Sequence, residues 1–307
     1  MSRYRAAGVE IESGLVLPGL HPASGSVAPP DVTVSVGETP PALADALERG
    51  ANWERAAGAL LVSIPGLARF LVREAGEIVV DPAPGAAPED LAIFAAGPML
   101  GLLLQLGGRI VLQASAVAVA GGAVLFCGPT SAGKSTLAAA LGRRGYPTIC
   151  DDLCAIDMTA PGGPRALADT TTLKLWAHAI MRLDLKEGPP VRAALRKHHV
   201  APPSGSVDAA PVRAIYMLIE ARPPHPPRIV RANVVDLALI VRRSAFRHSL
   251  GRALGQRAAY LAAAAQLASV AGVFSFERPL GFERVETGLD DLEAHWTHIG
   301  LARGRAS

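Results

Sequence analysis

The feature of this sequence that most constrains its fold is a glycine-rich turn between an apolar run and a helix-like segment. Residues Gly128 to Ser135 read "GPTSAGKS" and fit the pattern G-x-x-x-x-G-K-[ST] without a mismatch. The glycines permit positive φ and close backbone approach, so successive N–H groups can converge on phosphate oxygens. A helix that begins near Lys134 adds the positive end of its dipole. The pattern therefore predicts a strand, a phosphate-binding loop (P-loop, Walker A) and a helix in succession.

The residue types in this loop suit ATP together with Mg²⁺. We expect Lys134 to reach the β- and γ-phosphates and the Ser135 hydroxyl to ligate magnesium. A chance glycine turn is the alternative, but the strand-like "AVLFC" before the loop and the helix-like segment after it favour nucleotide binding. The residues expected to bind the nucleotide are Gly128, Pro129, Thr130, Ser131, Ala132, Gly133, Lys134, Ser135 and Thr136.

Two adjacent carboxylates, Asp151 and Asp152, follow the apolar run "PTIC". The end of a strand is where doubly wound sheets place ligand groups, and one acidic residue there holds magnesium in ordinary P-loop ATPases. Adjacent side chains on a strand point to opposite faces. We therefore expect one carboxylate to serve the metal and the other to face an acceptor hydroxyl as proton acceptor. The alternative is that one Asp merely caps a turn.

The composition sets the class of the chain and its surroundings. With 307 residues and 50% hydrophobic residues, the chain can bury a sizeable core in one large domain or two modest ones. Thirty basic against 27 acidic residues give no independent case for nucleic acid. Three cysteines, Cys127, Cys150 and Cys154, lie in or beside expected core strands and suit reduced apolar residues.

No apolar stretch of signal-peptide type begins the sequence. The segment "LAIFAAGPMLGLLLQLGG" is interrupted by Gly97 and Pro98, and we expect it to be too short to span a bilayer. A cytoplasmic protein without a membrane or nucleic-acid partner is the expectation.

The pattern of the chain predicts a β-rich region over residues 1–108, followed by a P-loop core over 109–307. In the first part we expect an irregular connection at 21–30, strands at 31–37 and 59–64, a hairpin that turns near Ala75 and Gly76, and a helix over 88–107 kinked at Pro98. The second part reads as two strands joined at Gly121 and Gly122, the loop and its helix to Gly145, and a strand over "PTICDD". A strand at "VRAIYMLIE", helical character over 235–270, a strand at "GVFSFERP" and a last helix follow.

Lys134 followed, after one short helix, by Asp151 and Asp152 resembles bacterial HPr kinase/phosphorylase. The resemblance implies an α/β P-loop core of the HPr kinase C-terminal-domain type, with Asp152 as proton acceptor for serine phosphorylation. We expect Asp151 to support the metal or Asp152. The family's catalytic histidine falls on Gln113, whose amide can orient a carboxylate but cannot carry a proton at neutral pH. The family's glutamate-arginine-glycine and "PVRPGRN"-like stretches do not appear, although "PVRAIYMLIE" echoes the latter at Arg213.

A closer resemblance is to the HPr-kinase-related proteins found beside lasso-peptide biosynthesis genes. It rests on "RFLVREAGEIVVD", "LQASAV", "GPTSAGKSTLAAALGRRGY", "DD", "LKLW" and "PVRAIY". This resemblance implies a kinase for the C-terminal serine of a lasso precursor peptide. Two alternatives stay open: a nucleotide-responsive binding module that has lost catalysis, and a kinase for an HPr-like protein or a small hydroxyl compound. HPr kinases form hexamers, but this sequence departs from the family pattern at several points, so we do not carry the hexamer over and leave the oligomeric state open.

Four further features have both a functional and a structural interpretation. The basic clusters "RKHHV" (196–200) and "VRRSAFRH" (241–248) could steady the γ-phosphoryl group, and His198 or His199 could replace the missing histidine, but we favour solvated charge for both. Trp176 either shapes an acceptor pocket or belongs to the core. Glu220 is either a second metal ligand or a surface cap.

Overall fold

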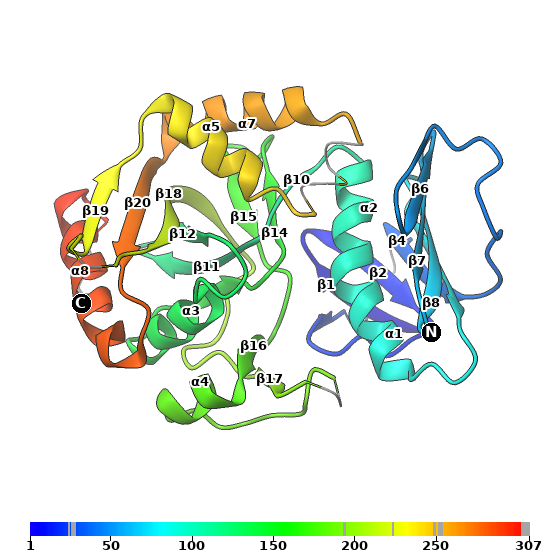
Figure 1. Cartoon of the computed structure of the whole chain (residues 1–307), viewed down its shortest axis with the longest axis horizontal. Helices are drawn as coiled ribbons and strands as arrows, with labels where there is room; N and C mark the ends of the chain where they lie inside the picture. The colour runs from blue at the N-terminus through cyan, green and yellow to red at the C-terminus, as the bar shows by residue number, and fades with distance from the viewer. Residues whose placement is uncertain are drawn as a thin grey trace.

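The computed structural model describes residues 1–23, 25, 29–192, 195–222, 224–247, 250 and 254–301. Parts of the connection expected at 21–30 and of the helical stretch expected at 235–270, as well as His248 of the second basic cluster, lie outside the described residues. The chain has a mixed α/β architecture with two large sheets (Figure 1).

The first sheet is built from residues 2–82. Its strands follow the order β3-β1-β2-β4-β9-β8-β7-β6-β5, and the β2–β4 and β4–β9 pairs are parallel while the other pairs are antiparallel. The strands are β1 Ser2–Ala6, β2 Val9–Ser13, β3 His21–Pro22, β4 Val32–Val36, β5 Glu48–Arg49, β6 Trp53–Ala56, β7 Ala59–Ile64, β8 Ala68–Arg73 and β9 Glu77–Pro82.

The predicted hairpin is confirmed as β8 and β9, which pair from Ala68–Pro82 to Arg73–Glu77. Gly76 makes the turn with φ +90°, and a Cβ there would collide with the carbonyl oxygen of Asp31. Only glycine therefore fits. The β1–β2 hairpin was not predicted, because its strands carry few consecutive apolar residues.

An apolar helical segment covers this sheet. It consists of α1 Pro88–Phe94, the π-helical turn η1 Ala95–Met99 and α2 Leu100–Leu106, and it ends at Gly107. The expected irregularity at Pro98 is present as the π-helical turn, since proline removes a backbone donor. By length and composition the 19-residue segment Pro88–Leu106, which has a mean hydropathy of 1.4 over 18 of its residues, could cross a membrane, so the expectation that it is too short was wrong. Within the described residues, however, 56% of that 18-residue stretch is buried inside the fold, as in the core helix of a soluble protein.

The second sheet comes from residues 110–278. Its order is β10-β14-β15-β18-β12-β11-β13, and β20 pairs with both β18 and β19. The β12–β18 and β18–β20 pairs are parallel, which brings the carboxyl ends of three strands to one edge. The strands are β10 Ile110–Leu112, β11 Ala114–Val119, β12 Gly122–Cys127, β13 Thr148–Cys150, β14 Cys154–Asp157, β15 Arg165–Leu167, β18 Ala209–Glu220, β19 Arg228–Arg231 and β20 Gly272–Arg278.

Helices cover both faces of this sheet. The helices are α3 Lys134–Arg143 and α8 Val285–His298 on one face, and α5 Val234–Arg243 and α7 Arg257–Val270 on the other. Successive residues of β12 point to opposite faces of the sheet. Val124 and Phe126 therefore pack with α3 and α8, whereas Leu125 packs with α5 and α7. The predicted strand–loop–helix succession over β12 and α3 is confirmed, and so are the strand at β18 and the last strand and helix. The three cysteines are buried and free. A short ribbon, β16 Leu173–Trp176 and β17 Lys197–Val200, and helices α4 Ala177–Arg182 and η2 Phe282–Arg284 complete the described elements.

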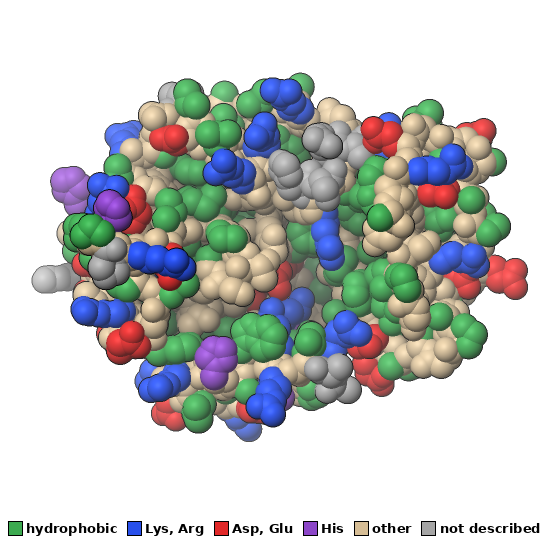
Figure 2. Space-filling view, in the orientation of Figure 1, with side chains coloured by type: hydrophobic (Ala, Val, Ile, Leu, Met, Phe, Trp, Pro, Cys, Tyr) green, Lys and Arg blue, Asp and Glu red, His purple; other side chains and the backbone are tan. Residues whose placement is uncertain are grey.

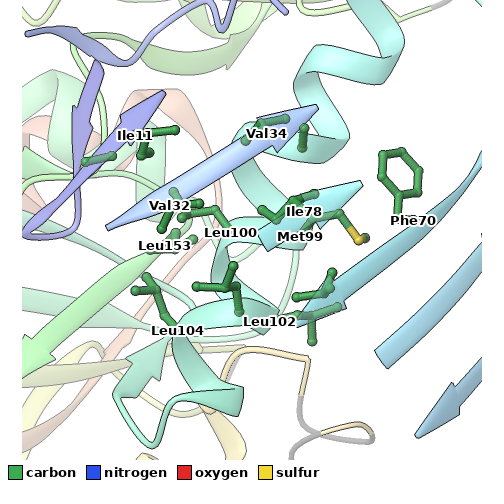
Figure 3. Packing of buried hydrophobic residues seen from close by; sticks show 14 of the residues in the cluster. Ile11, Val32, Val34, Phe70, Ile78, Met99, Leu100, Leu102, Leu104 and Leu153 are labelled. Carbon is green, nitrogen blue, oxygen red and sulfur yellow. The ribbon is translucent and has the colours of Figure 1, made fainter. Parts of the chain in front are cut away.

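One hydrophobic cluster joins the two sheets. Leu153, directly after the carboxylate pair, packs among residues of the first sheet and of α2, including Val32 and Leu100 (Figure 3). Phe246 belongs to the same cluster. Figure 1 shows α2 between the two sheets. Residues on both sides of the expected boundary at 108 thus share one core, and this core anchors the turn that carries Asp152.

Candidate functional site

The glycine-rich loop connects β12 to α3 at the edge where β12, β18 and β20 end. Gly133 precedes the helix in the left-handed region, with φ +83°, and a Cβ there would lie 2.7 Å from Nη2 of Arg278. Gly128, with φ +153°, lies so close to Ala132 and Leu218 that a Cβ would crowd both. The loop geometry therefore depends on both glycines of the sequence pattern.

Lys134 lies over this loop. The side chain is buried, and its Nζ donates hydrogen bonds to the carbonyl oxygens of Gly128 (2.9 Å) and Pro129 (3.0 Å). Burial lowers the pKa of the ammonium, while the negative charge of Asp152 acts in the opposite direction. The cation is thus held at the loop, close to the carboxylate pair.

The sequence predicted the carboxylate pair in a strand, but the structure places it in a turn. β13 ends at Cys150, and Asp152 has the left-handed φ of +75°. The argument from opposite strand faces was therefore wrong. The turn separates the two side chains nevertheless: Asp151 is 1% exposed, whereas Asp152 is partly exposed and lines a cavity.

Asp151 is held by hydrogen bonds on both carboxylate oxygens. Ser115 Oγ donates to Oδ1 (2.6 Å) and the Lys174 backbone N–H donates to Oδ2 (3.1 Å). Burial raises the pKa of Asp151, the charge of Asp152 raises it further, and hydrogen bonds from Ser115, Lys174 and Ser135 oppose this shift. Asp151 therefore supports Ser135 from behind the loop.

A third carboxylate, Asp169, completes this buried group. Its Oδ1 accepts a hydrogen bond from the backbone N–H of Asp151 (3.0 Å), and burial raises its pKa well above the usual range. Among the residues that the structure describes, no group of three or more His, Cys, Asp or Glu side chains is placed to hold a metal ion. The protein side of a magnesium site would thus be Ser135 with Asp151 behind it, which fits an ion that prefers one or two protein ligands and substrate phosphates.

A first cavity of about 360 Å³ opens in front of the loop, and we call it the loop cavity. Lys134 and Ser135 form its polar end. Trp176, Phe282 and Val285 form an apolar end, and Trp176 is 45% exposed. The core interpretation of Trp176 is therefore wrong.

Arg278, at the end of β20, also lines the loop cavity, and sequence reasoning missed it. Arg278 is 9% exposed. Its Nη2 donates a hydrogen bond to the carbonyl oxygen of Ala132 (2.8 Å), and its Nε has no hydrogen-bond partner among the described residues. Burial lowers its pKa, and within the described part of the chain no carboxylate forms an ion pair with it. A buried guanidinium that lies beside this loop and forms no such ion pair is suited to binding an anionic ligand.

A second cavity of about 510 Å³ adjoins the first, and we call it the seam cavity because its walls come from both parts of the chain. The first part of the chain contributes Pro18, Leu20 and Ile93 to its lining, and the second part contributes Phe246 and Arg247. Figure 2 shows the surface hollowed between the two parts, with Lys and Arg side chains along the hollow and acidic atoms in its depth. Five residues line both cavities: Gln113, Thr130, Asp152, Lys174 and Lys197.

Gln113 is the single residue between β10 and β11. It lines the loop cavity, the seam cavity and a third cavity of about 760 Å³ on the other side of the loop. Its backbone N–H donates to the carbonyl oxygen of Ser244 (2.6 Å). The position is central to the site.

The first basic cluster is partly in the site, although we favoured solvated charge. On β17, Lys197 and His199 line the seam cavity, and Lys197 Nζ lies 3.9 Å from Asp152 Oδ2. His198 instead contacts Glu187 (3.1 Å). In the second cluster, Arg243 and Arg247 line the seam cavity.

Two of the remaining candidates lie elsewhere. Glu220 pairs with Arg222 (2.7 Å) and lines only the third cavity, which favours a surface role for it. Arg213 is exposed and packs over Gly122 at the start of β12, away from the loop.

Comparisons with known proteins add little to this geometry. No protein-family model matches the chain, and no curated protein matches it. Among solved structures, one described as the Hpr(Ser) kinase/phosphatase from Coxiella burnetii aligns with 62% of this chain and 94% of that chain, at 13% identity and a TM-score of 0.33. A similarity at this level does not define the function of the chain.

Proposed function

We propose that this chain is an ATP-dependent kinase that transfers the γ-phosphoryl group to a serine hydroxyl. The observation that carries the proposal is the shared lining of two cavities. The loop cavity has the polar loop and a buried arginine suited to a triphosphate, and the seam cavity meets it at Asp152, Lys174 and Lys197. A donor and an acceptor bound in the two cavities would meet beside one carboxylate and two ammonium groups.

In the proposed reaction Asp152 takes the proton of the seryl hydroxyl. The hydroxyl oxygen forms a bond to the γ-phosphorus as the bond between this phosphorus and the β,γ-bridging oxygen breaks, and ADP leaves. Ser135, with Asp151 behind it, would hold Mg²⁺, and the bound ion would supply neutralisation of phosphate charge. Lys134, Lys197 and Arg278 would stabilise negative charge on the transferred group and on ADP.

Gln113 does not have to carry a proton in this scheme. Its place between the cavities allows its amide to orient Asp152 or a phosphate oxygen. The replacement of the family histidine by glutamine also motivates the second candidate, a nucleotide-responsive binding module without catalysis.

We further propose, from the sequence resemblance, that the acceptor is the C-terminal serine of a lasso precursor peptide in the cytoplasm. An HPr-like protein or a small hydroxyl compound is the alternative acceptor. Incubation with labelled ATP, Mg²⁺ and serine-ended peptides distinguishes these candidates. A mass gain of one phosphate on a peptide supports the kinase, and nucleotide-dependent binding without transfer to any acceptor supports the module.

Asp152→Asn tests the proposed base. We expect phosphoryl transfer to fall by about 10²–10⁴-fold, because the amide cannot accept the proton, while ATP affinity survives. Asp291→Asn, on the exposed face of α8, is the matched control and should leave both quantities unchanged. Normal turnover of Asp152→Asn would remove Asp152 from this role.

A further inference from the structure

The seam cavity has charged side chains that the proposed phosphoryl transfer does not use. Arg243, at the end of α5, and Arg247 line the seam cavity and do not line the loop cavity. Among the described residues neither forms an ion pair. Three acids line the same cavity: Asp151 and Asp169 accept the hydrogen bonds described above, and Asp152 lies 3.9 Å from Lys197.

His199 adds a buried hydrogen-bonding group to the same cavity. The residue is 5% exposed, its Nδ1 is 2.8 Å from the Thr172 hydroxyl, and its Nε2 is buried without a partner among the described residues. Burial, with Lys174 and Lys197 nearby, lowers the pKa of the imidazole to about 4, so the ring is neutral at neutral pH. A neutral ring with one unsatisfied nitrogen in a cavity is suited to a hydrogen bond with a bound polar group.

The wall of the seam cavity also contains apolar side chains, beside the polar and acidic residues already described. Leu20 comes from the first part of the chain, Ile93 and Pro98 from the helical segment, and Phe246 from the second part. Apolar side chains on one side and two guanidinium groups on the other suit a peptide end better than a highly charged nucleotide. The planar fork of arginine matches a carboxylate in particular.

We propose that the seam cavity binds the acceptor through a carboxylate close to its hydroxyl group, as at a peptide that ends in serine. Arg243 and Arg247 hold the carboxylate, His199 hydrogen-bonds the peptide end, and the N-terminal part of the chain forms one wall of the acceptor site. This inference rests on the proposed function for the hydroxyl's role, but binding of the carboxylate can be measured without phosphoryl transfer.

The test uses the tetrapeptide acetyl-Gly-Gly-Leu-Ser with a free carboxylate and the same peptide with a C-terminal amide. Calorimetry with the full chain should give at least tenfold tighter binding of the carboxylate form. The double variant Arg243→Gln/Arg247→Gln should lose that preference. Arg242→Gln, an exposed neighbour on α5 that lines none of the three cavities, should retain it.

A second variant blocks the cavity without disturbing the core. Gly97 lines the seam cavity, its φ is not positive, and a Cβ there would meet no atom within 4 Å. Gly97→Leu should therefore leave the protein folded, with a thermal midpoint at or above that of the wild type, since leucine favours a helix more than glycine does. It should abolish peptide binding and leave ATP binding intact.

The outcomes separate the two proposals. A carboxylate preference without phosphate transfer to any acceptor would support the acceptor site and contradict the kinase. Equal transfer to the acid and amide peptides would support the kinase and overturn the acceptor site. Absence of measurable peptide binding, or a preference that survives the double arginine variant, would also overturn it.

Discussion

Lys197 on β17 and Asp152 in the turn after β13 face each other with Nζ and Oδ2 3.9 Å apart, at the junction of the two cavities. Both side chains are partly exposed, so the pair itself contributes little to folding. β17 pairs with β16, which brings Lys174 to the same junction. Two ammonium groups and one carboxylate therefore surround the point where donor and acceptor would meet.

Lys197→Met should lower the rate constant of phosphoryl transfer by about 10²–10³-fold, because the variant removes a cation from the point where negative charge develops. The free energy of unfolding should change by less than about 0.5 kcal/mol, since the pair is partly exposed. Rapid-quench kinetics and urea unfolding measure the two quantities. Lys186→Met, which alters an exposed lysine outside the cavities, is the control. An unchanged rate in Lys197→Met would contradict the role.

Arg278→Met should have opposite effects on ATP binding and on stability. The affinity for ATP should fall by about 10–100-fold with the loss of a charge-assisted contact. The nucleotide-free protein should be as stable as the wild type or more stable by about 1–2 kcal/mol, because an apolar side chain replaces a buried cation that has no carboxylate partner in the described part of the chain.

Arg257→Met, at the exposed start of α7, should change neither property. Calorimetry gives the affinity and thermal unfolding gives the stability. A marked loss of stability in Arg278→Met with unchanged ATP affinity would show that the arginine is purely structural.

Ser115→Ala should destabilise the fold. The variant leaves Oδ1 of the buried Asp151 without its 2.6 Å hydrogen bond, which costs about 1–3 kcal/mol in unfolding free energy. The magnesium dependence of phosphoryl transfer should shift to higher concentration, because Asp151 supports Ser135. Ser35→Ala on β4, a partly exposed serine, is the comparison. Equal stability of the two variants would contradict the argument.

Asp169→Asn should change how stability depends on pH. Because the pKa of Asp169 is raised in the folded protein, the wild type binds this proton more tightly when folded, and it loses stability as pH rises from the ordinary value of 3.8 towards the raised one. The variant does not lose stability in this way, because asparagine has no carboxyl group to ionise. Its thermal midpoint should exceed that of the wild type at neutral pH, and the gain should vanish towards pH 4.

Asp81 provides the control of opposite sign. Hydrogen bonds from Arg69 and Thr39 lower its pKa, so its contribution to stability is present above the unfolded pKa and disappears as pH falls through the lowered one. Asp81→Asn should therefore destabilise the protein at neutral pH, and the deficit should shrink on acidification. A gain for Asp169→Asn that grows towards low pH would contradict the assignment.

Local features were predictable from the sequence. The succession of β12, the loop and α3, the β8–β9 hairpin and the irregular helix at Pro98 each depend on residues close together in the chain. Glycines supply positive φ, and a short-range apolar pattern selects strand or helix. The placement of Asp151 and Asp152 in a strand was wrong because β13 is only three residues long and ends before them.

The sequence by itself thus determined the loop with Lys134 and Ser135, the presence of a carboxylate pair after it, and the β-rich start of the chain. Tertiary structure alone decided which distant residues complete the site: Ser115 behind Asp151, Lys197 opposite Asp152, Arg278 against the loop, and the N-terminal wall of the seam cavity. The reason is physical. These contacts join segments far apart in the chain, and only the pairing of β18 with β12 and β20, together with the core shared through Leu153, brings those segments to one edge.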